Sequence, residues 1–261
     1  MSARAGVRAA ALAVLLCTPG SAFQQRARAP QLSHGGIIRG STAERRIALE
    51  FTGHEFAEGG TRILDELARR GARASFFLTG DFLRNPAFAP LIRRIAADGH
   101  YLGPHSDKHL LYCDWDTRDT TLVAREAFAR DLEDNLRSME ALGVRRGNVH
   151  YWVPAYEWYN AQIAAWSASL GLALVNYTPG TRSNADYTGE ADRNFVSSQR
   201  IYDSILARDR EDPNGLNGYL LLLHIGAGPG RADKMHNRLG GLLDDLSARG
   251  YRFVRVDELL R

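Results

Sequence analysis

Two histidines four residues apart, His105 and His109 in the segment HSDKH, have the spacing in this chain that most directly indicates chemistry. On one turn of a helix, side chains at this spacing lie about 5 to 6 Å apart between Cβ atoms, which suits joint ligation of one divalent ion. Neutral imidazole favours zinc or a similar first-row metal. Two unrelated surface histidines would show the same spacing. Whether the pair forms a metal site therefore has to be judged from its position in the fold.

A third histidine, His224, ends the apolar run YLLLLH. A histidine after a buried strand is often a core residue, and it becomes a candidate general acid only when another site faces it. The segment YWVPAYEWYN adds Trp152, Pro154, Tyr156 and Glu157. Aromatic clusters usually belong to a core, but in a polar loop they suit a sugar ring, so these four are predicted substrate contacts.

Short apolar runs alternate with segments of helical period from Ile47 to the C-terminus. This alternation requires a mainly parallel sheet, because each helix returns the chain to the same edge of the strand layer. We predict one α/β domain over residues 45–261, a distorted (β/α) barrel of about seven parallel strands. The strand segments are IALEF, ASFFLTG, YLGPH, HYWVPA, LALVNY, YLLLLH and YRFVRV.

In such folds the active site lies in the loops that follow the carboxyl ends of the strands. The histidine pair and His224 both follow predicted strands, and so does the turn TGHEFAEGG, which carries His54, Glu55 and Glu58. The titratable residues therefore gather on one rim of the predicted barrel, which favours a shared site.

The composition makes nucleic acid or an anionic membrane surface an unfavoured partner, because the formal charge of the 261 residues is only +3 and no run of five like charges occurs. Lys108 and Lys234 are the only lysines, and both fall in loops of the predicted rim. They are predicted to contact an anionic substrate group or the neighbouring Asp107 and Asp233, although coincidence explains two cases equally well.

The first residues are typical of a secretion signal, with Arg4 and Arg8 before the apolar stretch AAALAVLLC and small residues after it. The alternatives are a short buried helix or an anchor, but this stretch is too short to span about 30 Å of hydrocarbon. We predict a cleaved signal peptide over residues 1–22, a surface linker or disordered segment over 23–44, and a secreted or periplasmic protein without a membrane span.

The segments DGHYLGPHSDKH and GYLLLLHIG, followed by RLGGLLDDLSARGYRFVRVDELL, resemble motifs of the polysaccharide deacetylases, carbohydrate esterase family four with its NodB homology domain. The resemblance covers about residues 45–261. It implies that His105 and His109 bind a divalent metal, expected to be zinc, and that His224 is the general acid that protonates the leaving group. A carbohydrate substrate is implied with them.

The sequence departs from that family where the chemistry takes place. Members carry Thr-Phe-Asp-Asp-Gly after the first strand, with the catalytic base and a metal ligand as the two aspartates. Here an ungapped register places Thr52, Gly53 and His54 at the last three positions, so both carboxylates are missing. Trp152 stands where the third motif usually has an arginine, and the aspartate of the fourth motif is hard to place.

His54 is the candidate third metal ligand and Glu55 the candidate base, with Glu58, Asp107 and Glu157 behind it, and Thr52 is expected to line the substrate site. Removing an acetyl group needs an activated water, a charge that stabilises the oxyanion, and an acid for the leaving group. We predict a metal-dependent hydrolase that removes N- or O-linked acetyl groups from a carbohydrate. The alternatives are a protein of the same fold that binds glycan without hydrolysis, and a hydrolase of another amide or ester.

Overall fold

The computed structural model describes residues 29–261; the predicted signal peptide and the first residues of the predicted linker lie outside the described residues. The strands are β1 Gln31–Ser33, β2 Gly36–Arg39, β3 Arg46–Gly53, β4 Ser75–Leu78, β5 Tyr101–Pro104, β6 Tyr151–Trp152, β7 Ala173–Leu174, β8 Tyr219–His224 and β9 Arg252–Val254. The α-helices are α2 Gly60–Arg69, α3 Gly80–Arg84, α4 Ala89–Ala97, α5 Arg125–Ala141, α6 Ala161–Ser169, α7 Ser198–Glu211, α8 Leu239–Ala248 and α9 Val256–Leu259.

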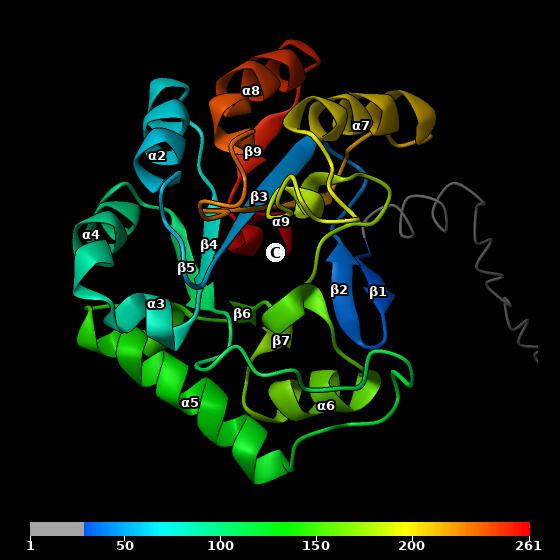
Figure 1. The fold of residues 1–261 in the computed structure, drawn as a ribbon. Coiled ribbons are helices and arrows are strands. Elements are labelled where there is room, and N and C mark those ends of the chain that lie inside the picture. Colours follow the sequence, from blue (N-terminus) through cyan, green and yellow to red (C-terminus); the bar gives the residue numbers. More distant parts are fainter. Residues whose placement is uncertain (1–28) are drawn as a thin grey trace, which may run out of the picture.

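The seven strands predicted from the sequence are β3 to β9, and the predicted barrel of mainly parallel strands is confirmed (Figure 1). β3 is the central strand, and it pairs in parallel with β8, β4 and β9. β4 continues the parallel sheet to β5, and β6 and β7 form a separate parallel pair. The carboxyl ends of these strands therefore meet on one rim, as the sequence predicted.

The N-terminal hairpin of β1 and β2 closes the barrel, so the prediction of a linker or disordered segment is wrong for residues 31–39. β2 pairs antiparallel with β8 and also bridges to the end of β7 through Ile37 and Val175. On the other side, Val153 N donates to Pro104 O and links the end of β6 to β5. A strand of four residues shows too little alternation to be recognised in a glycine-containing segment.

Two apolar cores lie on the two faces of the curled sheet. In β3, Ile47, Leu49 and Phe51 pack outward against the helices, whereas Ala48 packs inside the barrel. Because side chains alternate along a strand, Glu50 and Thr52 share the inner face with Ala48. The barrel interior therefore has layers, with apolar residues below and polar residues toward the rim.

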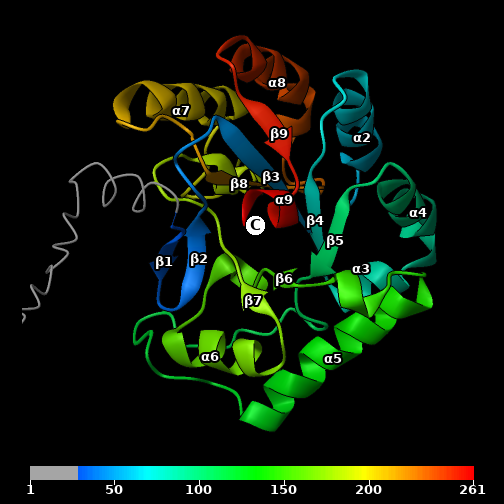
Figure 2. The ribbon, with the colours of Figure 1, turned by 180° about the vertical axis from the view of Figure 1, so that it is seen from behind.

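The helices cover the outside of the barrel, and the short C-terminal helix α9 closes its amino-terminal end (Figure 2). Val256 and Leu259 of α9 pack in the inner core with Ala48 and Leu220, which lie near the starts of β3 and β8. Access to the barrel interior is thus left at the opposite rim. None of the helices within residues 29–261 is long and apolar enough to cross a membrane.

Candidate functional site

A cavity of about 420 Å³ opens at the carboxyl ends of the strands and collects the predicted histidines. Thr52 and His224 are register partners on β3 and β8, and His105 directly follows β5, so the sheet itself brings these three together. The side chains that line the cavity are Thr52, His54, Glu55, Phe56, His105, His109, Trp115, Tyr156, Glu157, Tyr187, His224 and Ala227, together with Gly53 and Gly226.

The HSDKH segment is an irregular loop, so its prediction as a helical turn is wrong. Ser106 and His109 have positive φ angles of 70° and 54°, in the left-handed region. Asp131 of α5 fixes this shape, because its carboxylate accepts the backbone N–H groups of Asp107 and Lys108, each at 3.0 Å. Asn135, one turn later, donates to Ser106 O at 2.9 Å. The positions of His105 and His109 thus depend on contacts between their loop and α5, a helix that is distant in sequence.

Three imidazoles form a cluster at the cavity wall. The rings of His105 and His109 lie 5.2 Å apart between centroids, and the ring of His54 stacks on that of His109 at 4.5 Å with an interplanar angle of 10°. A hydrogen bond to the backbone fixes the orientation of the His105 ring, because Nδ1 lies 3.0 Å from Val153 O and must donate to that carbonyl. Nε2 of His105 is therefore the unprotonated nitrogen.

These imidazoles fit a divalent ion by their chemistry, although one ring has to turn before all three converge. A metal bound by two imidazoles lies close to both ring planes, whereas the stacked planes of His54 and His109 run side by side. Within residues 29–261, no group of three His, Cys, Asp or Glu side chains has the spacing of a formed metal site. His54 is the ring with more freedom, being about a third exposed.

Burial keeps two of the three rings neutral, which is the form that ligates a metal. Burial, reinforced by the neighbouring His109, holds the pKa of His105 well below its usual range. For His109, burial and the nearby His54 and His224 lower the pKa to about 3. Both rings are thus neutral at neutral pH, each with one protonated nitrogen and one nitrogen free to ligate a metal.

His224 faces this cluster and is held by Asp186, a residue that the sequence did not reveal. Nδ1 of His224 lies 2.7 Å from Asp186 Oδ1, and the backbone N–H of His224 donates to Asp186 Oδ2 at 3.0 Å. Because a carboxylate only accepts, Nδ1 carries a proton. Burial alone would lower the pKa of His224, but Asp186 and Glu157 outweigh it and raise that pKa. The pair has the arrangement of a general acid.

In the turn that replaces the two aspartates, Glu55 is exposed to solvent, whereas Glu58 binds the loop after β8. Glu55 is 67% exposed, and its Oε1 lies 3.9 Å from Nε2 of His54. Glu58 accepts the N–H groups of Ala227 and Gly228, each at 2.9 Å, and pairs with Lys234 at 2.6 Å. Glu58 therefore ties the turn after β3 to the loop after β8 and is unsuited to act as a base.

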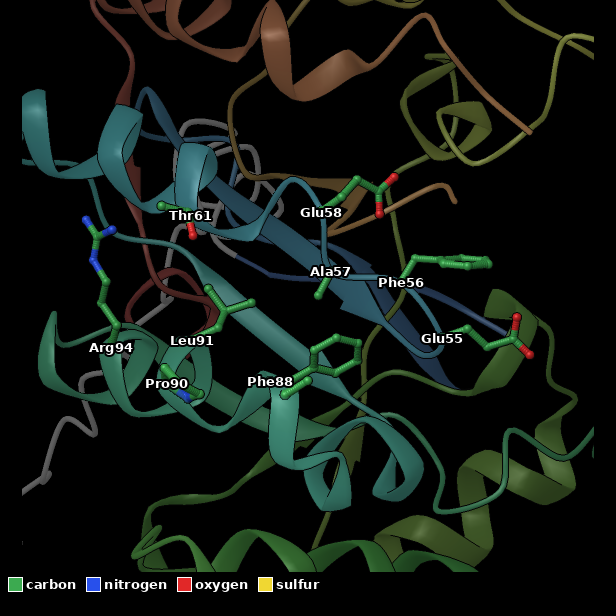
Figure 3. Close-up of a pocket in the computed structure, with 10 residues that line it drawn as sticks. Glu55, Phe56, Ala57, Glu58, Thr61, Phe88, Pro90, Leu91 and Arg94 are labelled. Carbon is green, nitrogen blue, oxygen red and sulfur yellow. The ribbon is translucent and has the colours of Figure 1, made fainter. Parts of the chain in front are cut away.

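A second hollow continues from this turn along the outside of the site (Figure 3). Phe88 and Leu91 form its apolar floor, and Glu55 and Arg94 lie at its opposite ends. Glu55 lines both the hollow and the histidine cavity. The hollow and the histidine cavity therefore share the turn after β3 as part of their walls.

Glu157 enters the cavity from the loop after β6 and is far more buried than Glu55. Its side chain is 10% exposed, and its Oε1 lies 3.9 Å from Nε2 of His105. Burial raises the pKa of Glu157 to about 7, an effect that Asp186 increases and His224 reduces. This loop also supplies Tyr156, whose ring lies 4.3 Å from that of His109.

Four predicted substrate contacts lie outside the cavity, and for these residues the structure differs from the sequence prediction. Trp152 is fully buried and packs against Phe128 of α5, and Pro154 is buried next to it. Lys108 pairs with Asp81 at 2.7 Å and with Asp107 at 3.6 Å, so the alternative predicted for it, a contact with Asp107, is confirmed. Lys234 pairs with Glu58. A strand of two residues, such as β6, offers no alternation that would show which side chain faces inward.

The structure adds two aromatic residues, Trp115 and Tyr187, that no sequence pattern selected. Trp115 stacks on Trp158 at 5.5 Å, and Tyr187 lies 5.1 Å from the ring of His224. Both line the cavity, and both are about half exposed. Tyr187 directly follows Asp186, so the dipeptide DY in the segment NADYT was the only signal for that part of the site.

We expect Gly80→Ala to destabilise the fold by about 1–3 kcal/mol, the usual cost of overfilling a packed site. A Cβ at Gly80, in the first turn of α3, would overlap the carboxylate of Asp107, which is itself fixed by Arg84 at 2.5 Å. Chemical denaturation measures the loss. Gly147→Ala is the control, since nothing lies within 4 Å of its added Cβ, and equal stability of the two variants would contradict the prediction.

Comparison with known proteins places this site in a family. A chitooligosaccharide deacetylase from Rhizobium leguminosarum bv. trifolii is 28% identical over 77% of this chain and 80% of its own length. A peptidoglycan-N-acetylglucosamine deacetylase from Listeria monocytogenes is 24% identical over 82% of this chain and 39% of its own.

Solved structures share the fold. A peptidoglycan N-acetylglucosamine deacetylase matches with a TM-score of 0.69 and 20% identity over 93% of this chain and 97% of its own. A CE4 family pseudoenzyme from Bacillus anthracis matches with a TM-score of 0.66 and 17% identity over 88% and 70%. A family model described as polysaccharide deacetylase matches residues 39–175. Because that match spans more than half of the sequence, the chain belongs to the polysaccharide deacetylase family.

Proposed function

We propose that the chain is a secreted, metal-dependent hydrolase that removes N- or O-linked acetyl groups from a carbohydrate. The observation that carries the proposal is the cluster of His54, His105 and His109 in the same cavity as the His224–Asp186 pair. Relatives named as chitooligosaccharide and peptidoglycan deacetylases support an N-acetylated glucosamine polymer as the substrate class.

In this proposal the three imidazoles hold the metal, with zinc expected from neutral nitrogen donors. A divalent ion bound there would lower the pKa of a water and polarise the acetyl carbonyl. His224 gives its proton to the departing amine or alkoxide, and Asp186 holds the imidazole in the orientation for that transfer. Two carboxylates line the cavity as candidate bases: Glu55, the residue favoured by the sequence, and Glu157.

The aromatic side chains around the opening support a sugar ligand. Trp115, Tyr156 and Tyr187 are each roughly half exposed and line the cavity together with Thr52. Exposed aromatic faces of this kind stack on the apolar faces of sugar rings. The predicted signal at residues 1–22 and the peptidoglycan-directed relatives support a secreted or periplasmic location, where such polymers are found.

Removal of the metal is expected to abolish activity while leaving the fold intact. The protein, purified without residues 1–22, is incubated with an N-acetylated chitooligosaccharide and, separately, with an O-acetylated xylan, and the released acetate is measured. Chelation should reduce release to background, and added zinc should restore it. Failure of the wild-type protein to hold zinc and to release acetate from either substrate would overturn the proposal.

A second candidate function is glycan binding without hydrolysis, which the loss of both first-motif carboxylates favours. His105→Ala separates the two candidates. If acetate release by the wild-type protein disappears in His105→Ala, the protein is an enzyme and this alternative fails. Glycan binding without acetate release, unchanged in His105→Ala, would support it.

A further inference from the structure

In the ungapped register Thr52 occupies the position of the family's catalytic base, so that position has no carboxylate in this chain. The residue is buried on the inner face of β3, beside His224 in the register, and its hydroxyl has no hydrogen-bond partner within residues 29–261. A threonine hydroxyl does not serve as a base in place of a carboxylate, since its pKa is far too high. A base for the attacking water must therefore come from another element that reaches the same cavity.

Of the two carboxylates that line the cavity, Glu157 is the buried one, and no Lys or Arg side chain within residues 29–261 forms an ion pair with it. Glu55 is two-thirds exposed, Glu58 clamps the loop after β8, and Asp107 is paired with Arg84 outside the cavity. Glu157 faces the cavity with its Oε1 3.9 Å from Nε2 of His105. That separation is too long for a hydrogen bond.

The backbone at Glu157, whose side chain lines the cavity, is strained. Tyr156 and Glu157 have positive φ angles of 59° and 52°, which cost non-glycine residues roughly 1–2 kcal/mol each. The turn is held by Glu157 N donating to Pro154 O at 3.0 Å and by Asn176 Nδ2 donating to Glu157 O at 2.7 Å. Strain that the surroundings maintain at a cavity is typical of a functional residue.

We propose that Glu157 is the general base of this enzyme, so that the base has moved from the end of β3 to the loop after β6. The assignment rests on the proposed deacetylase function. Glu157 takes one proton of the attacking water while the water oxygen bonds to the acetyl carbon. The bond from that carbon to the sugar nitrogen or oxygen then breaks, and the leaving atom takes the proton of His224. Solvent finally carries the proton of Glu157 away and reprotonates His224.

The test compares Glu157→Gln with Glu55→Gln, two isosteric changes at carboxylates that line the same cavity. Acetate release gives kcat and KM, calorimetric titration gives the zinc affinity, and thermal unfolding checks the fold. We expect Glu157→Gln to lower kcat by about 10²- to 10⁴-fold, the usual contribution of a general base, with KM and zinc affinity nearly unchanged. Glu157→Asp should recover part of the loss, and Glu55→Gln should lower kcat less than Glu157→Gln does. Glu126→Gln, at an exposed carboxylate of α5 outside the cavity, is the control and should leave kcat unchanged.

Three outcomes would overturn the assignment: full activity in Glu157→Gln, a loss of zinc affinity in step with its loss of kcat, or the larger loss of kcat in Glu55→Gln. The second outcome would make Glu157 a metal ligand, and the third would return the role to Glu55. A wild-type protein that releases no acetate removes the proposed function and this assignment with it, whereas active wild-type and active Glu157→Gln proteins remove the assignment alone.

Discussion

His224→Ala is expected to lower kcat for an N-acetylated sugar by about 10²- to 10⁴-fold, because a general acid contributes on that scale. An amine is a poor leaving group until it is protonated, and His224 lies on the cavity with Nδ1 fixed by Asp186 at 2.7 Å. Since Nδ1 donates to that carboxylate, Nε2 is the atom that delivers the proton. The measurement is acetate release from an N-acetylated chitooligosaccharide.

A substrate with a better leaving group separates loss of acid catalysis from damage to the site. The phenolate of 4-nitrophenyl acetate departs without a proton, so His224→Ala should lose much less activity on this ester than on the amide. Asp186→Asn should show the same selectivity to a smaller extent, because it disturbs the orientation of His224. His150→Ala, an exposed histidine outside the cavity, is the control. Equal losses on both substrates would contradict the role of acid.

The succession of strands along the chain and the rim position of three histidines followed from the sequence, because the strands are short, mostly apolar runs and these histidines lie at or just after strand ends. The run YLLLLH needs no knowledge of tertiary contacts to place His224 at the end of β8. The same reasoning placed His105 after β5. In both cases the signal is local, and the fold only has to align the strand ends.

The remaining parts of the site depend on contacts between distant segments and leave no local signal. The conformation of HSDKH is set by Asp131 and Asn135, more than twenty residues further along the chain. Asp186 lies in an irregular segment and reaches His224 across 38 positions of sequence. Glu157 lines the cavity from a turn with positive φ angles, which no residue type in YWVPAYEWYN predicts. Such positions are found by following hydrogen bonds, not by periodicity.

Glu50 is expected to make the stability of this protein fall as the pH rises from 5 to 8. It lies on the inner face of β3, below Thr52, with no exposed surface and with neither carboxyl oxygen hydrogen-bonded. Burial, reinforced by the nearby Glu157, raises its pKa to about 8 from 4.5. The folded state therefore holds this proton more tightly than the unfolded state, and the stabilisation, complete below pH 4.5, is lost as the pH rises toward 8.

At 1.36 kcal/mol per pKa unit, this one group lowers the free energy of unfolding by on the order of 3 kcal/mol between pH 5 and 8. Glu50→Gln keeps the shape and removes the ionisation, so its stability should vary much less with pH, and its Tm at pH 8 should exceed that of the wild-type protein. Glu157 and His224 also have shifted pKa values and both remain in the variant. The difference between the two curves therefore reports Glu50 together with its coupling to Glu157. Glu55→Gln, at an exposed carboxylate, is the matched control. Parallel curves for wild type and Glu50→Gln, measured by thermal and urea unfolding, would show that Glu50 ionises in the folded protein as it does in water.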